Sequence, residues 1–331
     1  GPWTYFEFDL REPTMHVDDP QLGWRNKPGR YTIPPYSPEG EEIRMTFLED
    51  GTRASGGSPG HGPARRSAAD GAGTESRRLV LLGGSYIEGF AISDPETLAW
   101  KLHERFPGFD VRNYGTAGYG TYQSLLLLER ILETWRPALV IYGFNTVHEF
   151  RNVAPSWWLK ALSRFSQRAT VYLPFATADE RGELVRHPPE RFPVWPLSER
   201  LASVNFLQEL VTKFRTRDRV SQARFVTKKL ILEMRDLARE RETPFLVMIL
   251  GARPAARNYA ELFEARRIRW LDCSVPLDRG LIVTGEGHPN GRANTLWADC
   301  LSRFLDGAGR DLLAFEKGGD PSGARKPFPT P

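Results

Sequence analysis

The chain has 331 residues, of which 40% are hydrophobic and 11% aromatic, so it is long enough to form one large α/β domain with insertions. Its 45 Lys and Arg residues against 41 Asp and Glu residues give a formal net charge of +4, a surplus too small to indicate a nucleic-acid partner. No run of about eighteen apolar residues occurs and the first residues lack the pattern of a signal peptide, so the sequence predicts no membrane-spanning helix.

The N-terminal part differs in composition from the rest of the chain. Residues 1–50 are rich in proline, polar and aromatic residues, and we predict an extended arm with short strands that wraps the core. Residues 51–76 are rich in Gly, Ser, Ala, Pro and Arg and contain no large apolar residue. Because such a composition cannot repay the entropy of ordering, we predict a flexible loop there.

From residue 77 onward, apolar runs of strand length alternate with segments of helical spacing. This alternation is typical of a parallel sheet covered by helices on both faces. We predict strands over 79–82, 110–113, 138–144, 244–250 and 268–272, and helices over 95–106, 123–135, 221–241 and 290–305. Asp94 is the expected N-cap of the first helix. The resulting domain spans 77–310, and residues 311–331 form a polar tail.

Polar residues follow three of the predicted strands. The first strand ends in Gly83-Gly84-Ser85, the second leads into the glycine-rich segment 113–121, and the third delivers Asn145 just past its end. Because the carboxyl ends of parallel strands meet at one edge of a sheet, these segments converge. A serine where a buried strand turns into a helix can act as a nucleophile, and glycine N–H groups and an amide can donate to an oxyanion.

A late histidine completes this set. His288, in Gly287-His288-Pro289-Asn290, can take the proton of Ser85 once the fold brings the two together. The combination predicts acyl transfer or ester cleavage. The glycines around Ser85 do not have the spacing of a dinucleotide-binding or P-loop motif. Ile87 stands where a Gly-x-Ser-x-Gly nucleophile elbow has its second glycine, which disfavours the α/β-hydrolase fold.

The four segments, in this order, resemble the serine, glycine, asparagine and histidine blocks of the SGNH (GDSL-like) hydrolase superfamily. The resemblance covers about residues 77–305 and implies that Ser85 is the nucleophile and His288 the general base. It also implies an oxyanion hole formed by the Ser85 N–H, Gly118 and Asn145. The implied fold is a three-layer α/β/α sandwich with a parallel, flavodoxin-like five-stranded sheet and a long insertion after the third strand. Residues 19–29 further resemble the leader of a longer, envelope-associated branch.

Three positions depart from the family pattern. Gly84 stands where the family usually has an aspartate, and Thr146 stands where the asparagine block continues with aspartate. The family's acid normally lies three residues before the histidine, at the position of Gly285, and Glu286 is the nearest carboxylate. Either Glu286 orients His288, which we slightly favour, or a backbone carbonyl does so in a Ser-His dyad. An exposed Glu286 that only solvates the loop is the alternative.

The two cysteines flank the histidine block. Cys273 and Cys300 could form a disulfide that steadies His288 in an oxidising compartment, or remain two small buried thiols, and the sequence favours neither. There is no Cys-x-x-Cys motif and no pair of histidines at metal-ligand spacing. We therefore expect no metal and no cofactor.

The insertion, at about residues 150–220, follows Asn145 at the mouth of the expected cleft. Four residues at its start are candidate substrate contacts: His148, Arg151, Trp157 and Trp158. A small core of its own is the favoured alternative for the tryptophans, because these rings bury well. Seven basic residues between 213 and 229 could meet an anionic lipid or polysaccharide, although a solvated helix face is the better interpretation.

The sequence thus predicts a serine esterase or O-acyltransferase that acts on O-acyl groups, with O-acetyl favoured, of an envelope or extracellular carbohydrate. One alternative, which the three departures favour, is a catalytically weakened SGNH fold that binds carbohydrate or serves as a scaffold. A lipid esterase is the third option, supported by the aromatic residues of the insertion. The expected partner is an acylated carbohydrate or other ester, without nucleic acid.

The expected location is extracytoplasmic, either periplasmic or membrane-associated. Gly1-Pro2 resembles the remnant of a protease cleavage site, so we expect a leader or membrane anchor to have been removed upstream. A cytoplasmic location is the alternative. Acyl donor, acceptor and oligomeric state do not follow from the sequence.

Overall fold

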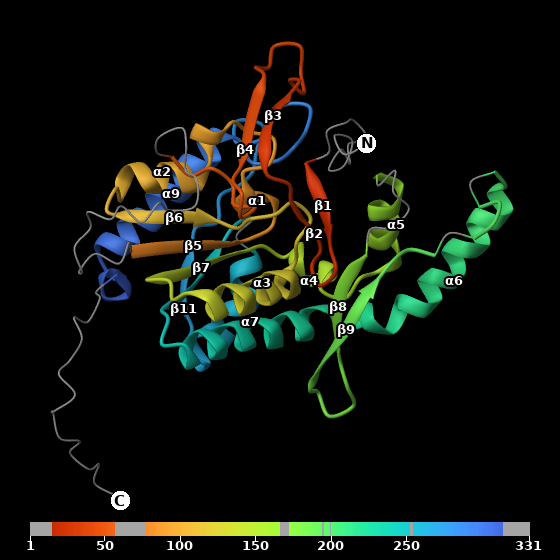
Figure 1. Cartoon of the computed structure of the whole chain (residues 1–331). Helices are drawn as coiled ribbons and strands as arrows, with labels where there is room; N and C mark the ends of the chain where they lie inside the picture. The colour runs from red at the N-terminus through yellow and green to blue at the C-terminus, as the bar shows by residue number, and fades with distance from the viewer. Residues whose placement is uncertain are drawn as a thin grey trace, which may run out of the picture.

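A parallel sheet of five strands forms the middle layer of the protein (Figure 1). The computed structural model describes residues 15–56, 77–165, 172–193, 195–198, 200–251 and 254–313. The strands are β5 (Arg77–Gly83), β6 (Phe109–Asn113), β7 (Leu139–Phe144), β10 (Phe245–Ile249) and β11 (Arg269–Asp272), and their order in the sheet is β11-β10-β7-β5-β6. This is the flavodoxin-like order, so the predicted fold class is confirmed.

Alternate side chains of the strands enter two separate cores. On β5, Val80 and Leu82 belong to one core, whereas Leu79 and Leu81 belong to the other. The helices over the two faces are α3 (Thr121–Thr134) and α7 (Ala223–Glu240) on one, and α2 (Leu98–Arg105) and α9 (Gly291–Asp306) on the other. All residues of β7 and β10 are buried, as expected for a sheet covered on both faces.

The N-terminal arm forms two antiparallel hairpins. The first pairs β1 (His16–Asp19) with β2 (Gly23–Asn26), and the second pairs β3 (Gly29–Ile33) with β4 (Ile43–Phe47). The second hairpin covers a third, small core that includes Phe90, two residues past α1 (Ser85–Glu88). The arm is thus packed against the segment that follows the candidate nucleophile.

Residues 51–56 pack against the body instead of starting the predicted flexible loop. Arg53 is fully buried, and its Nε lies 2.7 Å from Asp94 Oδ1. Its other guanidinium nitrogens donate to the carbonyl oxygens of Gly89 and Ile92. The predicted flexible loop was therefore wrong for residues 51–56. An arginine among small residues is typical of a solvated loop, and the sequence does not show that Arg53 binds Asp94 in the interior. Residues 57–76, like 1–14 and the tail from 314 onward, lie outside the described residues.

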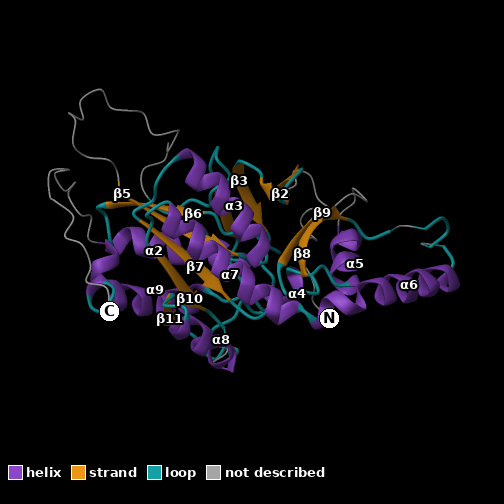
Figure 2. Cartoon of the chain, turned by 90° about the horizontal axis from the view of Figure 1, so that it is seen from below, coloured by secondary structure: helices purple, strands orange, loops and turns teal. Residues whose placement is uncertain are grey.

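The insertion after β7 contains more regular structure than the sequence indicated. Its elements are α4 (His148–Arg151), α5 (Ser156–Phe165), the antiparallel pair β8 (Leu173–Ala178) and β9 (Leu184–Glu190), and α6 (Ala202–Ser221). Figure 2 shows α6 extending away from the three-layer body. No helix in the described part of the chain is long and apolar enough to cross a membrane.

The helices differ from the prediction at two places. The helix expected over 95–106 is divided into a 3₁₀ turn (Asp94–Glu96) and α2, because Thr97 breaks the helical path and caps α2 by accepting from Trp100 N. Asp94 is therefore not a cap, since its carboxylate binds Arg53 instead. Helix α8 (Pro254–Ala265), between β10 and β11, was not predicted.

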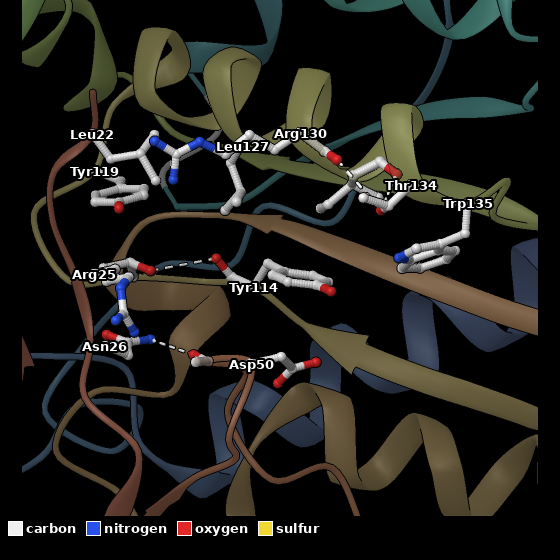
Figure 3. A pocket seen from close by; sticks show the side chains of 13 residues that line it. Leu22, Arg25, Asn26, Asp50, Tyr114, Tyr119, Leu127, Arg130, Thr134 and Trp135 are labelled. Carbon is white, nitrogen blue, oxygen red and sulfur yellow. Dashed lines mark hydrogen bonds between the residues drawn. The ribbon is translucent and has the colours of Figure 1, made fainter. Parts of the chain in front are cut away.

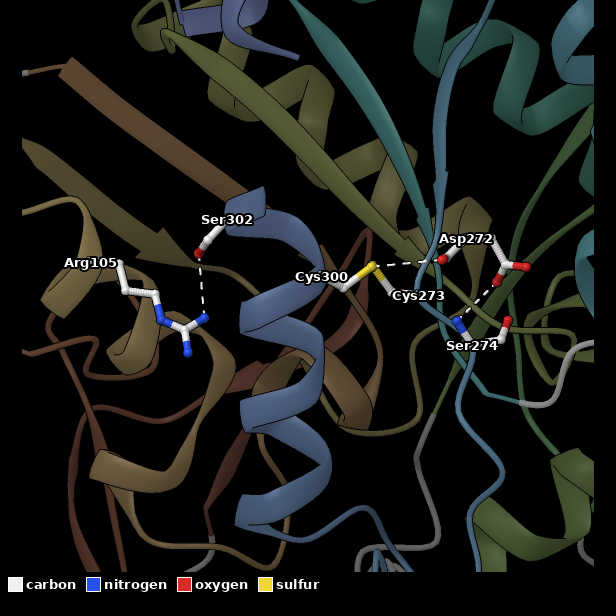
Figure 4. Close-up of a disulfide and its surroundings, with 6 residues drawn as sticks. All are labelled: Arg105, Asp272, Cys273, Ser274, Cys300 and Ser302. Atoms are coloured by element: carbon white, nitrogen blue, oxygen red, sulfur yellow. Dashed lines mark hydrogen bonds between the residues drawn. A yellow bond between two sulfur atoms is a disulfide. The ribbon is translucent and has the colours of Figure 1, made fainter. Parts of the chain in front are cut away.

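A disulfide joins Cys273, just past β11, to Cys300 on α9 (Figure 4). The sequence left open whether the two cysteines form a disulfide or remain buried thiols, and the structure shows the disulfide. The loop that it closes contains Glu286 and His288. Helix α9 is itself held to α2, because the Asn294 side chain accepts a hydrogen bond from Leu98 N.

Removal of the bridge should destabilise the fold. The bridged residues are 27 positions apart, a loop for which chain-entropy arguments give roughly 3 to 4 kcal/mol. We expect the Cys273→Ala/Cys300→Ala double variant to lose about that much free energy of unfolding in urea titrations. An unchanged unfolding midpoint in the double variant would contradict this expectation.

Candidate active site

Ser85, His288 and Glu286 form one hydrogen-bonded series. Ser85 is the first residue of α1, and its Oγ lies 3.0 Å from His288 Nε2. The other ring nitrogen, Nδ1, lies 2.6 and 2.7 Å from the two carboxylate oxygens of Glu286. All three residues are less than 10% exposed, at 4%, 4% and 7%. This geometry allows the imidazole to take a proton from the serine while the carboxylate holds it from behind.

Aromatic rings fix the plane of the imidazole. The ring of Phe90 lies 5.0 Å from that of His288, and the ring of Tyr86 lies 6.0 Å away, edge-on. Tyr86 in turn stacks on Trp297 of α9, with ring centroids 5.7 Å apart. These contacts restrict rotation of the imidazole, so its alignment toward Ser85 does not depend on hydrogen bonds alone.

The position of Glu286 follows from a steric constraint one residue earlier. Gly285 has φ +86°, and a Cβ on it would lie 2.3 Å from the carbonyl oxygen of Tyr36. No side chain fits there, so the carboxylate cannot stand three residues before the histidine. Glu286 supplies it instead and also accepts from the backbone N of His288 at 2.6 Å. The longer glutamate side chain spans the altered spacing.

The glycine block forms a tight turn at the same edge of the sheet. Tyr119 N donates to Thr116 O at 3.1 Å, and Gly118, inside this turn, has φ +84°. Such a φ favours glycine. The backbone N–H groups of Gly118 and Ser85 have no hydrogen-bond partner among the described residues, so both are available to a ligand.

The loop of Asn145 is internally bonded, although Thr146 follows it. Asn145 Oδ1 accepts from Val147 N at 3.0 Å, and its carbonyl accepts from His148 N at 3.1 Å. The Asn145 Nδ2 finds no partner within the described ranges, and it remains a candidate oxyanion donor.

The N-terminal arm supports the glycine block, a role that sequence reasoning missed. Trp24 Nε1 donates to Ala117 O at 3.0 Å, and Asn26 Nδ2 donates to Gly115 O at 3.1 Å. Both residues belong to β2. The only signal in the sequence was the resemblance of residues 19–29 to the leader of the longer family branch, which does not say what the leader contacts.

Gly84 lies close to polar atoms of three residues. A Cβ on Gly84 would lie 3.0 Å from Tyr119 O, 3.1 Å from Arg151 Nη1 and 3.1 Å from His148 Nε2. Arg151 Nη1 donates to Tyr119 O at 3.0 Å, which holds the guanidinium in place. The space next to the nucleophile is therefore filled by side chains of α4, and a larger residue at position 84 would displace them.

His148 belongs to a buried polar network beneath this space. Its Nδ1 lies 2.7 Å from the Tyr142 hydroxyl, which lies 2.8 Å from Thr121 Oγ1. The side-chain amide of Asn152 donates to the same Thr121 oxygen and to Thr227 Oγ1. Burial, with a smaller effect of the nearby Arg151, holds the pKa of His148 well below its usual value. This histidine is therefore neutral in the folded protein.

The four candidate substrate contacts differ in exposure. His148 is 0% exposed and Arg151 5%, and both lie beneath Gly84 rather than at the surface. Trp158 is 3% exposed and packs against Arg151, whose guanidinium lies 5.0 Å from its ring centroid. Trp157 is 48% exposed. Of the four, only Trp157 presents a large surface to solvent.

Two pockets lie near these elements. One, of about 680 Å³, lies between residues 91–93 after α1 and residues 282–284 before Glu286, and glutamates from the arm line it. The second, of about 230 Å³, lies on the outer side of the glycine block, between β2 and α3 (Figure 3). None of the candidate catalytic residues lines either pocket. Within the described residues, no group of three or more His, Cys, Asp and Glu side chains could hold a metal ion.

No protein-family model and no curated protein matches the chain, but solved structures do. A member of the lipolytic protein G-D-S-L family from Veillonella parvula is 12% identical with a TM-score of 0.40, over 71% of this chain and 100% of that chain. A psychrotrophic esterase from a Pseudoalteromonas species is 10% identical with a TM-score of 0.39, over 70% and 100%. A carbohydrate esterase is 11% identical with a TM-score of 0.42, over 71% and 70%.

The neutral state of His148 makes stability depend on pH. Below the ordinary histidine pKa of 6.5, the unfolded chain gains a proton at this residue that the folded chain does not accept, so stability is lost as the pH falls. We expect His148→Gln to be less stable than the parent at about pH 8, with a difference that shrinks by up to about 1.4 kcal/mol per pH unit below the histidine pKa. Urea unfolding at several pH values measures this difference.

A stability difference between His148→Gln and the parent that stays constant over this pH range would contradict the expectation, because the folded chain would then bind a proton at His148 as readily as the unfolded chain does.

Proposed function

We propose that this protein is a serine esterase or O-acyltransferase that acts through an acyl-enzyme. The observation that carries the proposal is the simultaneous contact of His288 with Ser85 Oγ, at 3.0 Å, and with the Glu286 carboxylate, at 2.6 Å. A serine is a weak nucleophile at its own pKa, and this arrangement supplies both a base and a group that orients the base. The fold alone would not support a function, because one fold hosts many.

In the proposed reaction, the Ser85 oxygen attacks the carbonyl carbon of an ester while His288 Nε2 takes the serine proton. Glu286 accepts the hydrogen bond from Nδ1–H and stabilises the imidazolium that forms. The negative charge on the carbonyl oxygen is met by the N–H groups of Ser85 and Gly118 and by the Asn145 amide. Each such donor contributes roughly 3 kcal/mol to the transition state.

Collapse of this intermediate releases the alcohol, which receives the proton from His288, and leaves the acyl group on Ser85. The same histidine then deprotonates an acceptor, which attacks the acyl-enzyme and frees the serine. Water as acceptor gives hydrolysis, and a sugar hydroxyl gives transfer. The two activities share every residue of the proposed site and differ only in the acceptor.

The departures from the family pattern support an active site more than a weakened one. At position 285 a side chain is excluded by Tyr36, and the neighbouring Glu286 carboxylate bonds the histidine directly. At position 84 the space next to the nucleophile is filled by Arg151 and His148. The displaced acid thus has a replacement in Glu286, and the space at position 84 is occupied.

The substrate we propose is an O-acyl group, with acetyl favoured, on a carbohydrate. Two observations support this class. The pocket of about 680 Å³ adjoins the histidine loop through residues 282–284 without touching the candidate catalytic residues, has space for sugar rings and is lined in part by polar residues. The exposed indole of Trp157 offers a flat surface of the kind on which sugar rings stack.

We place this reaction outside the cytoplasm. The disulfide between Cys273 and Cys300 supports the proposal, because such bonds persist in oxidising compartments and are rare in cytosolic proteins. The loop that it closes carries both Glu286 and His288, so an oxidising location would also favour an ordered site.

Substitution of the nucleophile is the direct test of turnover. We expect Ser85→Ala to lower kcat for a chromogenic acetyl ester by about 10⁴-fold or more, because no other group can form the acyl-enzyme. The matched control is Ser198→Ala, a buried serine in the insertion, which should retain activity. Equal turnover by Ser85→Ala and the parent would reject the proposal, and carbohydrate binding without turnover in either protein would favour the binding-module alternative.

Glu286→Gln separates a triad from a dyad. An amide cannot stabilise the imidazolium and can donate to Nδ1, which favours the wrong tautomer, so we expect kcat to fall by about 10² to 10⁴-fold with little change in KM. The exposed Glu264→Gln on α8 serves as the control. A Glu286→Gln variant with parental kcat would show that the carboxylate is dispensable.

A further inference from the structure

Helix α6 has its polar face inward. Its buried residues are Gln208, Thr212 and Thr216, at 2 to 3% exposure. Gln208 Oε1 accepts from Trp195 N at 2.6 Å, and Thr216 Oγ1 accepts from Ser156 N at 3.2 Å. The helix is therefore fixed to the insertion largely by hydrogen bonds and not by burial of an apolar stripe, which is the usual arrangement of a surface helix.

The outer face of α6 is apolar. Phe206, Leu210 and Phe214, which are spaced four residues apart and thus share one face, are 68%, 52% and 69% exposed. Leu207 beside them is 50% exposed, and Leu201, just before the helix, is 46% exposed. We call these five residues the α6 ridge. Exposed apolar groups scattered singly are normal, but a continuous ridge on one helix marks an interaction surface.

Positive charge accompanies the ridge. Between residues 200 and 221 there are five cations against two carboxylates, Glu209 and Asp218. One of the five, Arg219, is paired with Glu190 of β9, so the other four carry the charge of this surface. Glu209 is paired with Lys160, and Asp218 lies 3.3 Å from Arg217. The Arg217 guanidinium also lies 5.1 Å from the ring of Phe214, so charge and apolar surface are interleaved rather than separated. Such a surface complements a negatively charged partner with an apolar interior.

The position of α6 suits such a partner. Figures 1 and 2 both show the helix extending from the body as its outermost described element. A convex ridge of this kind can enter a deformable lipid interface, whereas a rigid protein partner would need a matching groove. The ridge is also free of the sheet edge and of the residues proposed to perform the chemistry.

We propose that the α6 ridge docks the protein on an anionic lipid surface, with the ridge side chains among the acyl chains and the cations at the headgroups. A second copy of the chain fits this surface less well. Two α6 helices packed face to face would place Lys213, Arg215 and Arg217 of both copies close together, with few carboxylates to neutralise them. The proposal concerns surface binding only and is independent of the proposed esterase activity.

Vesicle co-sedimentation of the full chain tests the proposal. Vesicles of phosphatidylcholine with about one third phosphatidylglycerol provide the anionic surface, and pure phosphatidylcholine provides the neutral one. We expect binding to the anionic vesicles that is at least tenfold stronger than to the neutral ones and weaker at high salt. Both Leu210→Ser and Lys213→Glu/Arg217→Glu should lower it by roughly tenfold or more.

The matched control is Leu296→Ser on α9, where the leucine is 43% exposed but lies outside the ridge, and its vesicle binding should equal that of the parent. All variants should retain the parental urea unfolding midpoint, since the altered residues are exposed. No binding of the parent to anionic vesicles, or equal binding by Leu210→Ser and Leu296→Ser, would overturn the proposal. So would a dimer in sedimentation equilibrium that Leu210→Ser dissociates, because the ridge would then be a contact between copies.

Discussion

The hydrogen bond between Ser85 and His288 is the contact on which the site depends, and it joins residues 203 positions apart. A hydrogen bond of 3.0 Å forms only if the two segments that carry these residues are positioned to within a fraction of an ångström. The pairing of β5 with β7 on one side and β6 on the other fixes the serine at its end, and the aromatic rings of Phe90 and Tyr86 fix the imidazole. The disulfide and α9 limit the freedom of the segment between them. The fold therefore supplies much of the preorganisation that the chemistry needs.

The N-terminal arm shapes two segments of the candidate site. Tyr36 belongs to the N-terminal arm, and its carbonyl oxygen excludes any side chain at position 285. The same arm holds the glycine block through Trp24 and Asn26. The position of the Glu286 carboxylate and the support of the glycine block therefore both involve the arm.

Much of the core could be predicted from the sequence because its signals are local. Apolar runs such as 138–144 identify buried strands, and Ser85, Gly118, Asn145 and His288 all follow or precede such elements. The polar face of α6 and the burial of Arg53 could not be predicted, because each depends on partners far along the chain. Residue type alone indicates a solvated arginine and an exposed threonine face, and only tertiary contacts reverse both. For the same reason, His148 was expected near substrate although it lies in the interior.

The central claim is that Ser85 is an activated nucleophile, and covalent labelling measures this directly. The purified chain would be treated with a serine-reactive phosphonate, and the modified peptide would be located by mass spectrometry. The account predicts one adduct, on Ser85, formed much more slowly when His288 is changed to Ala. A folded chain that forms no adduct, or one that is labelled at another serine, would contradict it.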